Sequence, residues 1–283
     1  VYGLAANAYK NSAVKKIFNL KKRPKNNPLI VHYHDIDSLK KDCLINDNFT
    51  KLYKKFSPGP LTYVLQLRKD SKISKYVTNN KKNLAVRFPK HTLLKNLLKQ
   101  LDYPLAAPSA NITTKLSAVK AKDVKEEFGN KIKYILDGGV CAIGIESTIV
   151  NLTGRPSILR LGGLDILKIQ KTLGSKINIS INPKKKIVPG QSRLHYSPGI
   201  PLRMNITKPK NNEAFIVIKR KKTKLKNYFY LTNKNNLDEA AKNLYSCLRK
   251  IKNEGYKSIA VEKIPNIGLG RAINDRLRRA SKY

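Results

Sequence analysis

The chain has 283 residues, enough for one large domain or for a large and a small one. Its 58 Lys and Arg residues against 18 Asp and Glu give a formal net charge of +40, which should attract polyanions in a salt-dependent manner. No apolar run approaches the roughly 20 residues that span a bilayer, and three widely separated cysteines exclude a disulfide framework or a Cys-x-x-Cys zinc site. We therefore expect a cytoplasmic protein without a membrane segment.

The first predicted element is a short amphipathic helix, because apolar residues recur at spacings of three and four within residues 14–18. Ser12 is its expected N-cap, and Pro24 should end it. Lys21 and Arg23 would then lie where the helix ends.

A proline-clamped loop at residues 24–28 follows and leads into a predicted buried strand at residues 29–32. Two cations and an amide on so stiff a loop suit an anion, because the loop cannot rearrange to let water screen the charges. A helix C-terminus also favours basic residues, so the same two cations taken alone have a purely structural explanation.

Apolar segments with polar ends continue to about residue 180 and predict an α/β sheet domain. The first predicted strand of this region begins at residue 61. The others occupy residues 84–89, 105–107, 132–136, 144–152 and 158–161. The predicted helices occupy residues 92–101, with Thr92 as the cap, and residues 123–128, with Gly129 as the end.

The pattern breaks at about residues 179–202, which are rich in Pro, Gly and Lys, and a linker of this length is usually either disordered or functional. After it, the predicted order is two strands, a helix, a strand and a helix, which indicates a small α/β domain. We therefore predict a large α/β domain at residues 1–180, a linker at 181–202 and a small C-terminal domain at 203–283. The elements of the small domain are strands at residues 214–218, 228–231 and 258–261 and helices at residues 237–251 and 271–280.

In this order the segments resemble the YrdC-type threonylcarbamoyl-AMP synthases in their longer, two-domain form. The resemblance covers nearly the whole chain. It implies a twisted, open, mixed sheet with flanking helices, followed by a linker and a small α/β domain. The matching motifs are the Lys-x-Arg of Lys21 and Arg23, the Ser-x-Asn of Ser109 and Asn111, Pro189-Gly190 with His195-Tyr196-x-Pro198, and residues 268–277. Residues 268–277 can be either a phosphate loop or a helix start whose glycines allow close packing. We favour the helix start.

The resemblance implies an enzyme, a nucleotidyltransferase, that joins L-threonine, bicarbonate and ATP into threonylcarbamoyl-AMP and pyrophosphate. The product serves the modification of the adenosine beside the tRNA anticodon, so a tRNA-modifying transferase complex would act downstream. Such chemistry needs positioning and charge stabilisation more than covalent help. The sequence shows no carboxylate cluster for a metal, so Mg²⁺ should arrive with the ATP phosphates.

The same resemblance assigns the site residues. Lys21 and Arg23 would be the catalytic cations. The expected ATP-binding residues are Lys21, Arg23, Asn27, Asn83, Asn111, Ser117, Arg160, His195 and Tyr196. The expected threonine-binding residues are His32, Arg87, Ser109, Ser147 and Thr148.

Some of these assignments have alternatives. Arg87 lies in an apolar strand, so it needs either a ligand or a carboxylate partner, for which Glu146 is the candidate. Asn83 stands where the family often has threonine, and Leu161 stands where it usually has proline. Between residues 189 and 198, rigid prolines flank a short polar stretch, which suits a lid over the nucleotide.

Two other functions compete with the synthase. A non-catalytic RNA-binding protein would also use a basic domain, and weak RNA binding could accompany the enzyme. However, no aromatic stacking motif is present, and much of the lysine excess accompanies an Asn- and Ile-rich composition. The second competing function is that of the related domain of hydrogenase-maturation carbamoyltransferases. Those proteins are much longer and have Cys-rich segments, which this chain lacks.

Residues 1–8 resemble the family's second motif, which is preceded there by a strand ending in Pro-Thr-Glu-Thr. The last threonine of that motif contacts substrate and would fall immediately before Val1. We therefore expect the 283-residue chain alone to be poorly stable and to bind threonine weakly, and we expect restoration of the upstream segment to recover activity.

Overall fold

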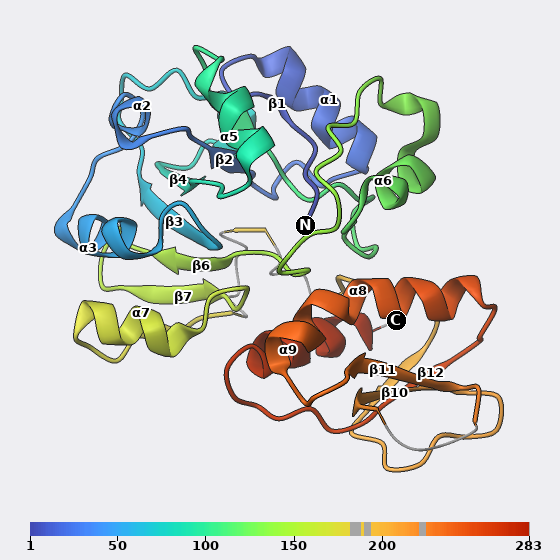
Figure 1. Cartoon of the computed structure of the whole chain (residues 1–283). Helices are drawn as coiled ribbons and strands as arrows, with labels where there is room; N and C mark the ends of the chain where they lie inside the picture. Colours follow the sequence, from blue (N-terminus) through green and yellow to red (C-terminus); the bar gives the residue numbers. More distant parts are fainter. Residues whose placement is uncertain (182–187, 190–193, 221–224, 283) are drawn as a thin grey trace.

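The computed structural model describes residues 1–181, 188–189, 194–220 and 225–282. It contains an eight-stranded sheet and a separate four-stranded sheet, each with its own helices (Figure 1). Within these residues no helix is both long enough and apolar enough to cross a lipid bilayer.

The larger sheet has the strand order β1-β5-β2-β4-β3-β6-β7-β8 and is mixed. Three neighbouring pairs are parallel (β2–β4, β3–β6 and β7–β8), and the other pairs are antiparallel. The strands are β1 (Ala6–Asn7), β2 (Ile30–His32), β3 (Leu61–Gln66), β4 (Asn83–Arg87), β5 (Leu105–Ala106), β6 (Thr148–Asn151), β7 (Ser157–Arg160) and β8 (Asn178–Ile179). The helices are α1 (Asn11–Lys21), α2 (Ile36–Lys40), α3 (Asp47–Phe56), α4 (Lys75–Thr78), α5 (Thr92–Lys99), α6 (Ala121–Phe128), the 3-10 turn η1 (Gly129–Lys131) and α7 (Ile166–Leu173).

The two faces of this sheet differ, because successive residues of a strand point to opposite sides. On one face Val31, Val86 and Val150 belong to the main apolar core, to which α1, α3 and α7 also contribute. On the other face Ile30, Ala85, Val64 and Ile149 form a smaller apolar cluster that Val188 covers. The ends of the strands on this second face carry the polar residues described below.

Three local predictions are wrong. Residues 132–136 form no strand, and Tyr134 is 84% exposed. The composition of this segment favours a strand, but no neighbouring strand among the described residues pairs with it. Helix α1 begins at Asn11, after Lys10, and Ser12 does not cap it. Thr92 is the first residue of α5, so it is His91 that precedes the helix.

The smaller sheet is parallel throughout, with the order β11-β10-β12-β9. It confirms the predicted small α/β domain and adds β9, which the sequence pattern did not reveal. Gly270 begins the last helix, and a Cβ there would lie 2.0 Å from the Pro265 carbonyl oxygen, so close packing explains this glycine. The elements are β9 (Leu202–Met204), β10 (Ala214–Lys219), β11 (Tyr228–Thr232), α8 (Leu237–Asn253), β12 (Ile259–Val261) and α9 (Gly270–Ala280).

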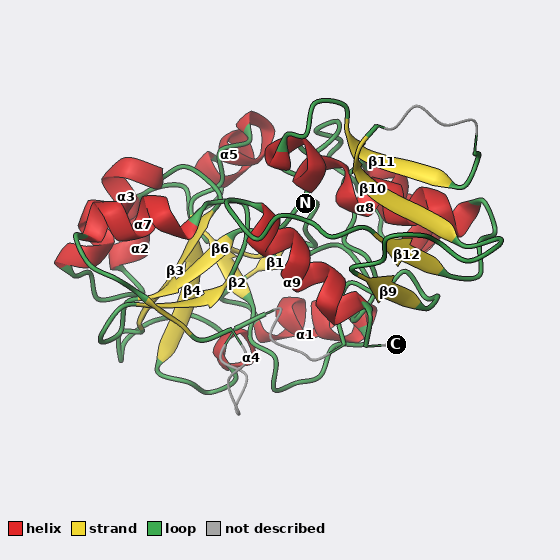
Figure 2. Ribbon diagram, turned by 90° about the horizontal axis from the view of Figure 1, so that it is seen from below, coloured by secondary structure: helices red, strands yellow, loops and turns green. Residues whose placement is uncertain are grey.

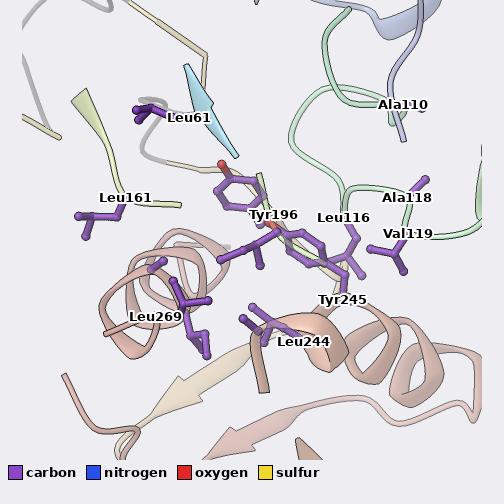
Figure 3. Packing of buried hydrophobic residues seen from close by; sticks show 14 of the residues in the cluster. Leu61, Ala110, Leu116, Ala118, Val119, Leu161, Tyr196, Leu244, Tyr245 and Leu269 are labelled. Carbon is purple, nitrogen blue, oxygen red and sulfur yellow. The ribbon is translucent and has the colours of Figure 1, made fainter. Parts of the chain in front are cut away.

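Helices α8 and α9 lie between the small sheet and the large domain (Figures 1 and 2). Leu244 and Tyr245 of α8 share one buried cluster with Leu161 of the large domain and with Tyr196 of the segment that joins the two sheets (Figure 3). The C-terminal unit therefore packs directly against the end of β7.

Candidate ligand-binding site

The strand registers bring several predicted site residues to one end of the large sheet. His32 pairs with Arg87 across β2 and β4, and Arg87 pairs with Thr62 across β4 and β3. On the far side of β3, the start of β6 lies beside Leu61, and Ile149 of β6 pairs with Arg160. Three parts of the chain far apart in sequence thus meet where the predicted threonine and nucleotide sites should join.

Lys21 and the Ser-x-Asn motif are in direct contact. The Lys21 ammonium, 1% exposed, donates to the carbonyl oxygens of Ser109, at 2.6 Å, and of Asn111. Ser109 Oγ donates to Asn111 Oδ1 at 2.6 Å, so the two side chains are in contact. Lys21 is therefore held at the bend after β5, with one ammonium proton beyond those two bonds.

Arg23 is fixed by its own loop. Its guanidinium donates to the Asn27 carbonyl oxygen at 2.9 Å, to Asn27 Oδ1 at 2.7 Å and to the Pro28 carbonyl oxygen at 2.8 Å. These bonds use Nε and Nη2, and Nη1 takes no part in them. The proline-clamped loop thus presents a rigid guanidinium, a geometry suited to phosphate.

Arg87 is not paired with Glu146, so the ion-pair alternative is wrong. Its Nε donates to the Gly59 carbonyl oxygen at 3.0 Å. Its neighbour in register, His32, has a buried Nδ1 without a hydrogen-bond partner among the described residues. A buried polar atom without a partner is unfavourable, and a carboxylate or hydroxyl of a ligand would satisfy it.

Ser147 and Arg160 form a second contact group. Ser147 Oγ lies 2.7 Å from Thr62 Oγ1, and Arg160 donates to Ser147 Oγ at 3.1 Å and to the Ser147 carbonyl oxygen at 3.0 Å. Thr148 turns elsewhere, because its hydroxyl donates to the Leu164 carbonyl oxygen at 2.6 Å. Of the two neighbouring hydroxyls, Ser147 therefore has the place better suited to a ligand.

Glu146 is the centre of a buried network that the sequence alone did not reveal. Ser117 Oγ donates to its Oε1 at 2.5 Å, and the hydroxyl of Tyr245 donates to its Oε2 at 3.0 Å. Arg276 of α9 donates to Oε2 at 3.0 Å. The predicted ATP-binding residue Ser117 is thus held by a carboxylate that the C-terminal domain holds in turn.

The segment between the two domains brings His195 and Tyr196 to the same place. Both side chains are buried, at 7% and 1% exposure, and their rings lie 4.0 Å apart. The segment is anchored where the Ser197 amide donates to the Thr114 carbonyl oxygen at 2.8 Å. Pro189 also lies here, since Arg160 donates to its carbonyl oxygen at 3.3 Å. Gly190 and the rest of residues 190–193 of the predicted lid lie outside the described residues.

The electrostatics of this end of the sheet disfavour positive charge. Burial, together with Arg160, lowers the pKa of Arg23 to about 9 and that of Arg87 to about 10. Burial and the neighbouring Arg23 lower the pKa of Lys21 well below its usual range, and burial and nearby cations lower the pKa of His32 to about 3. Several cations that depress one another in a buried place are typical of a site for a polyanion.

The His195 imidazole is affected in the same way, because burial lowers its pKa to about 3 and the effect of Glu146 in the opposite direction does not compensate. The carboxyl of Glu146 is the opposite case. Burial would raise its pKa, but Arg276 and Arg160 lower it to about 2. It is therefore ionised at neutral pH and partly balances the surrounding cations.

Asn83 lies apart from the residues at the strand ends. It begins β4, at the end opposite to Arg87, and lines a small cavity with Pro28 and Val188. Pro28 accepts a hydrogen bond from Arg23, so the cavity borders the Arg23 loop. The sequence patterns missed Thr62, Tyr245 and Arg276. Of these three residues, only Thr62 had a signal in the sequence, because a polar residue stands there at the start of an apolar strand.

Comparison with known proteins gives consistent matches along the whole chain. The family profile described as "Telomere recombination", of the Sua5, YciO and YrdC proteins, matches residues 1–162, and the profile "Threonylcarbamoyl-AMP synthase, C-terminal domain" matches residues 164–282. The chain is 36% identical to the threonylcarbamoyl-AMP synthase of Pyrococcus abyssi, with 100% of this chain and 88% of that protein covered. It is 34% identical to the enzyme of the same name from Bacillus subtilis, with 99% and 87% covered. The crystal structure of P. abyssi Sua5 complexed with L-threonine superposes with a TM-score of 0.91 at 35% identity, covering 100% of this chain and 88% of that one.

Proposed function

Since the chain belongs to the Sua5/YrdC family, in its form with a C-terminal domain, we propose that it is an L-threonylcarbamoyladenylate synthase. The reaction joins L-threonine, bicarbonate and ATP into threonylcarbamoyl-AMP and pyrophosphate. The curated relatives that carry this name align over nearly the full chain, and the superposed P. abyssi structure is a complex with L-threonine.

One structural observation supports this proposal most strongly. Lys21, Arg23, Arg87 and Arg160 converge at the end of the large sheet, and each has its pKa lowered, first by burial and for three of them also by another of these cations. A triphosphate would relieve that repulsion. His32, whose Nδ1 has no partner among the described residues, and the Ser147 hydroxyl lie beside it and would serve a small polar amino acid.

The reaction needs two bond-forming steps. The amine of threonine adds to the bicarbonate carbon, water leaves, and a carbamate results. A carbamate oxygen then attacks the α-phosphorus of ATP, and pyrophosphate leaves with the electron pair of the broken P–O bond. Negative charge builds up on the phosphoryl oxygens in this step, so fixed cations are the main requirement.

The residues of this chain would divide the task as follows. Lys21, held on two carbonyl oxygens, and Arg23, held on its own loop, keep their positions as the charge moves. Both would contact the phosphates, and Arg160 would lie on the other side of the ligand, beside Ser147. No reorganisation of these groups is needed during the reaction, which is the condition under which charges contribute most to catalysis.

Threonine would bind between His32, Arg87, Ser109 and Ser147. With its lowered pKa the imidazole of His32 is neutral, so it can accept a hydrogen bond from a hydroxyl or donate one to a carboxylate, depending on its tautomer. Among the described residues no group of three or more acidic, His or Cys side chains is placed to hold a metal ion. We therefore propose that Mg²⁺ enters with ATP and supplies charge neutralisation on the phosphates.

The cellular role follows from the product. Threonylcarbamoyl-AMP is a mixed anhydride that a tRNA-modifying transferase can consume, so we propose that this adenylyl transfer supplies the threonylcarbamoyl modification of tRNA. The strongly basic surface would aid the approach of ATP and could add weak, salt-dependent RNA binding.

A pyrophosphate-release assay tests the proposal. Turnover should require ATP, threonine and bicarbonate together, and the nucleotide product should incorporate label from both threonine and bicarbonate. Serine, which lacks the methyl group, is the matched control substrate and should react more slowly. Pyrophosphate release that is independent of threonine would contradict the assigned reaction.

A further inference from the structure

Arg276 of α9 is one of the side chains through which the C-terminal domain reaches the ligand site. This guanidinium is 1% exposed and donates to Glu146 Oε2 at 3.0 Å and to the Leu161 carbonyl oxygen at 2.5 Å. Both partners belong to the large domain and flank residues that line the site. Within α9 the guanidinium donates only to the Ala272 carbonyl oxygen, at 3.3 Å, and it lies 3.7 Å from Asp275. A buried arginine whose shortest hydrogen bonds go to another domain is costly to separate from its partners, so it favours one relative position of the two domains.

Arg276 also lies against Tyr196, with the guanidinium carbon 5.2 Å from the centre of the ring. The ring of Tyr196 also stacks with the ring of Tyr245 of α8, with 5.8 Å between the ring centres and an interplanar angle of 27°. Two side chains of the C-terminal domain therefore hold Tyr196, as the close view of this packing shows for Tyr196 and Tyr245 (Figure 3).

The backbone of Tyr196 needs such support. Its φ is +61°, in the left-handed region that a bulky residue other than glycine rarely adopts. This conformation is unfavourable by itself and persists only where the surroundings determine it. The neighbouring residues His195 and Ser197 are directed by the same backbone, one into the cluster of cations and one to Thr114.

We propose that Arg276 is a positioning residue of the ligand site, which holds Tyr196 in its left-handed conformation and thereby sets His195 and Tyr196 over the bound nucleotide. Glu146 fixes the guanidinium, and the guanidinium and Tyr245 together fix the ring. The C-terminal domain would thus complete the site without supplying a group that touches the reacting atoms. The catalytic consequence rests on the proposed function, whereas the structural one does not.

Hydrogen exchange of the backbone amides at residues 194–198, read together with ATP affinity and turnover, tests this proposal. In Arg276→Ala the exchange of the Ser197 amide should become at least about tenfold faster, and kcat/KM for ATP should fall by a similar factor. Arg276→Lys should recover only part of both effects, because an ammonium cannot lie flat on the ring and bind Glu146 at once.

Arg249→Ala is the matched control. Arg249 of α8 makes another ion pair between the domains, 3.5 Å from Asp123, but it does not contact Tyr196. This variant should leave the exchange at residues 194–198 and the turnover unchanged. Equal effects of Arg249→Ala and Arg276→Ala would mean that any loosening of the domain contact has the same result, and they would overturn the proposal.

The double variant Arg276→Met with Glu146→Gln removes both buried charges, so it avoids an unpaired carboxylate and should keep the wild-type melting temperature. Its exchange at residues 194–198 should still be fast. If the double variant restores wild-type exchange and turnover, Arg276 only neutralises Glu146, and the proposal is wrong. If the exchange responds as expected but the wild-type protein makes no threonylcarbamoyl-AMP, the proposed function fails and the positioning of Tyr196 stands.

Discussion

Lys21 and Arg23 differ in how the fold holds them. The ammonium of Lys21 is bound to the bend after β5, whereas Arg23 is bound to carbonyl and amide oxygens of its own loop. Removing Lys21 therefore disturbs a contact between distant segments, and removing Arg23 disturbs one loop. Both cations are assigned to the proposed site, but their substitutions should affect stability differently.

We expect Arg23→Ala and Lys21→Ala each to weaken ATP binding by about 1.5–3 kcal/mol, the usual loss for a hydrogen bond to a charged group. Lys21→Ala should also lower the melting temperature, since it leaves two buried carbonyl oxygens without their donor. Isothermal titration with ATP measures the first effect. Lys25→Ala, on the exposed side of the same loop, is the control for charge alone. ATP affinity unchanged in both site variants would refute their assignment.

The two buried histidines predict a pH dependence of stability. The pKa of His32 and that of His195 are lowered from 6.5 to about 3. Between these values the unfolded chain binds a proton that the folded chain does not. The free energy of unfolding should therefore fall as the pH decreases below 6.5, by up to about 1.4 kcal/mol per pH unit for each histidine.

Urea unfolding at pH 7.5 and pH 5 measures this dependence. His32→Asn should lose less stability than the wild type between the two pH values, and His91→Asn, which changes an exposed histidine, should behave like the wild type. An equal loss in all three proteins would show that other groups cause the acid sensitivity.

At this scale the sequence indicated which residues lie near one another better than how they are held. The order and types of Lys21, Arg23, Ser109 and Asn111 resemble a family motif. The structure brings Lys21, Ser109 and Asn111 into contact, whereas Arg23 is bound to its own loop. The partner of Glu146 was not predictable, because Arg276 lies 130 residues further along the chain and only the packing of two domains brings it there. Local patterns contain no information on such a contact.

At the scale of elements, a tight junction lies where β7 ends. A Cβ added to Gly162 would lie 2.3 Å from the Thr148 nitrogen and 2.4 Å from the Glu146 carbonyl oxygen. The end of β7 is therefore pressed against the segment that carries Glu146, Ser147 and Thr148. The close approach of the two backbones requires a glycine here. The atoms nearest to an added Cβ are backbone atoms, which cannot move aside as a side chain could.

Gly162→Ala should destabilise the protein by about 1–3 kcal/mol or more through overpacking, and it should raise the KM for threonine because Ser147 is displaced. Gly154→Ala, with no atom within 4 Å of the added Cβ, is the matched control and should be nearly neutral. Differential scanning calorimetry and initial rates measure the two effects. Similar melting temperatures of the two variants would contradict the close approach.

The segment between the domains should respond to ligands. If residues 189–198 act as a lid over the nucleotide, ATP with threonine should protect them from limited proteolysis, because a closed lid excludes water and protease alike. Cleavage after the exposed Arg155, between β6 and β7, is the internal control and should not change. Cleavage of residues 189–198 at the same rate with and without ligands would rule out a lid.

Elements were predictable where they are long and periodic. The helix at α1 and the strands at β3, β4, β10 and β11 follow the expected spacing. Strands β1, β8 and β9 have only two or three residues, too few for a pattern. Residues 132–136 show the opposite error, a strand that was predicted but is not formed. The segment is largely apolar, but no strand among the described residues pairs with it.

At the scale of the whole molecule, the two sheets share one apolar cluster, which extends from α1 to α9. We therefore expect the two domains to unfold together, in a single calorimetric transition whose van't Hoff and calorimetric enthalpies agree. Arg276→Ala with its domain contact weakened should broaden this transition. Two well-separated transitions in the wild-type protein would show that the shared cluster does not couple the domains.

If the cluster of mutually repelling cations binds ATP as proposed, it also links the folding of the protein to the supply of nucleotide. A polyphosphate that binds the folded chain and not the unfolded one adds to the free energy of unfolding, by about 2.7 kcal/mol when its free concentration is one hundred times its Kd. The folded population would then rise and fall with the nucleotide pool. A starving cell would lose substrate and, through the same charges, part of its supply of the protein that uses it.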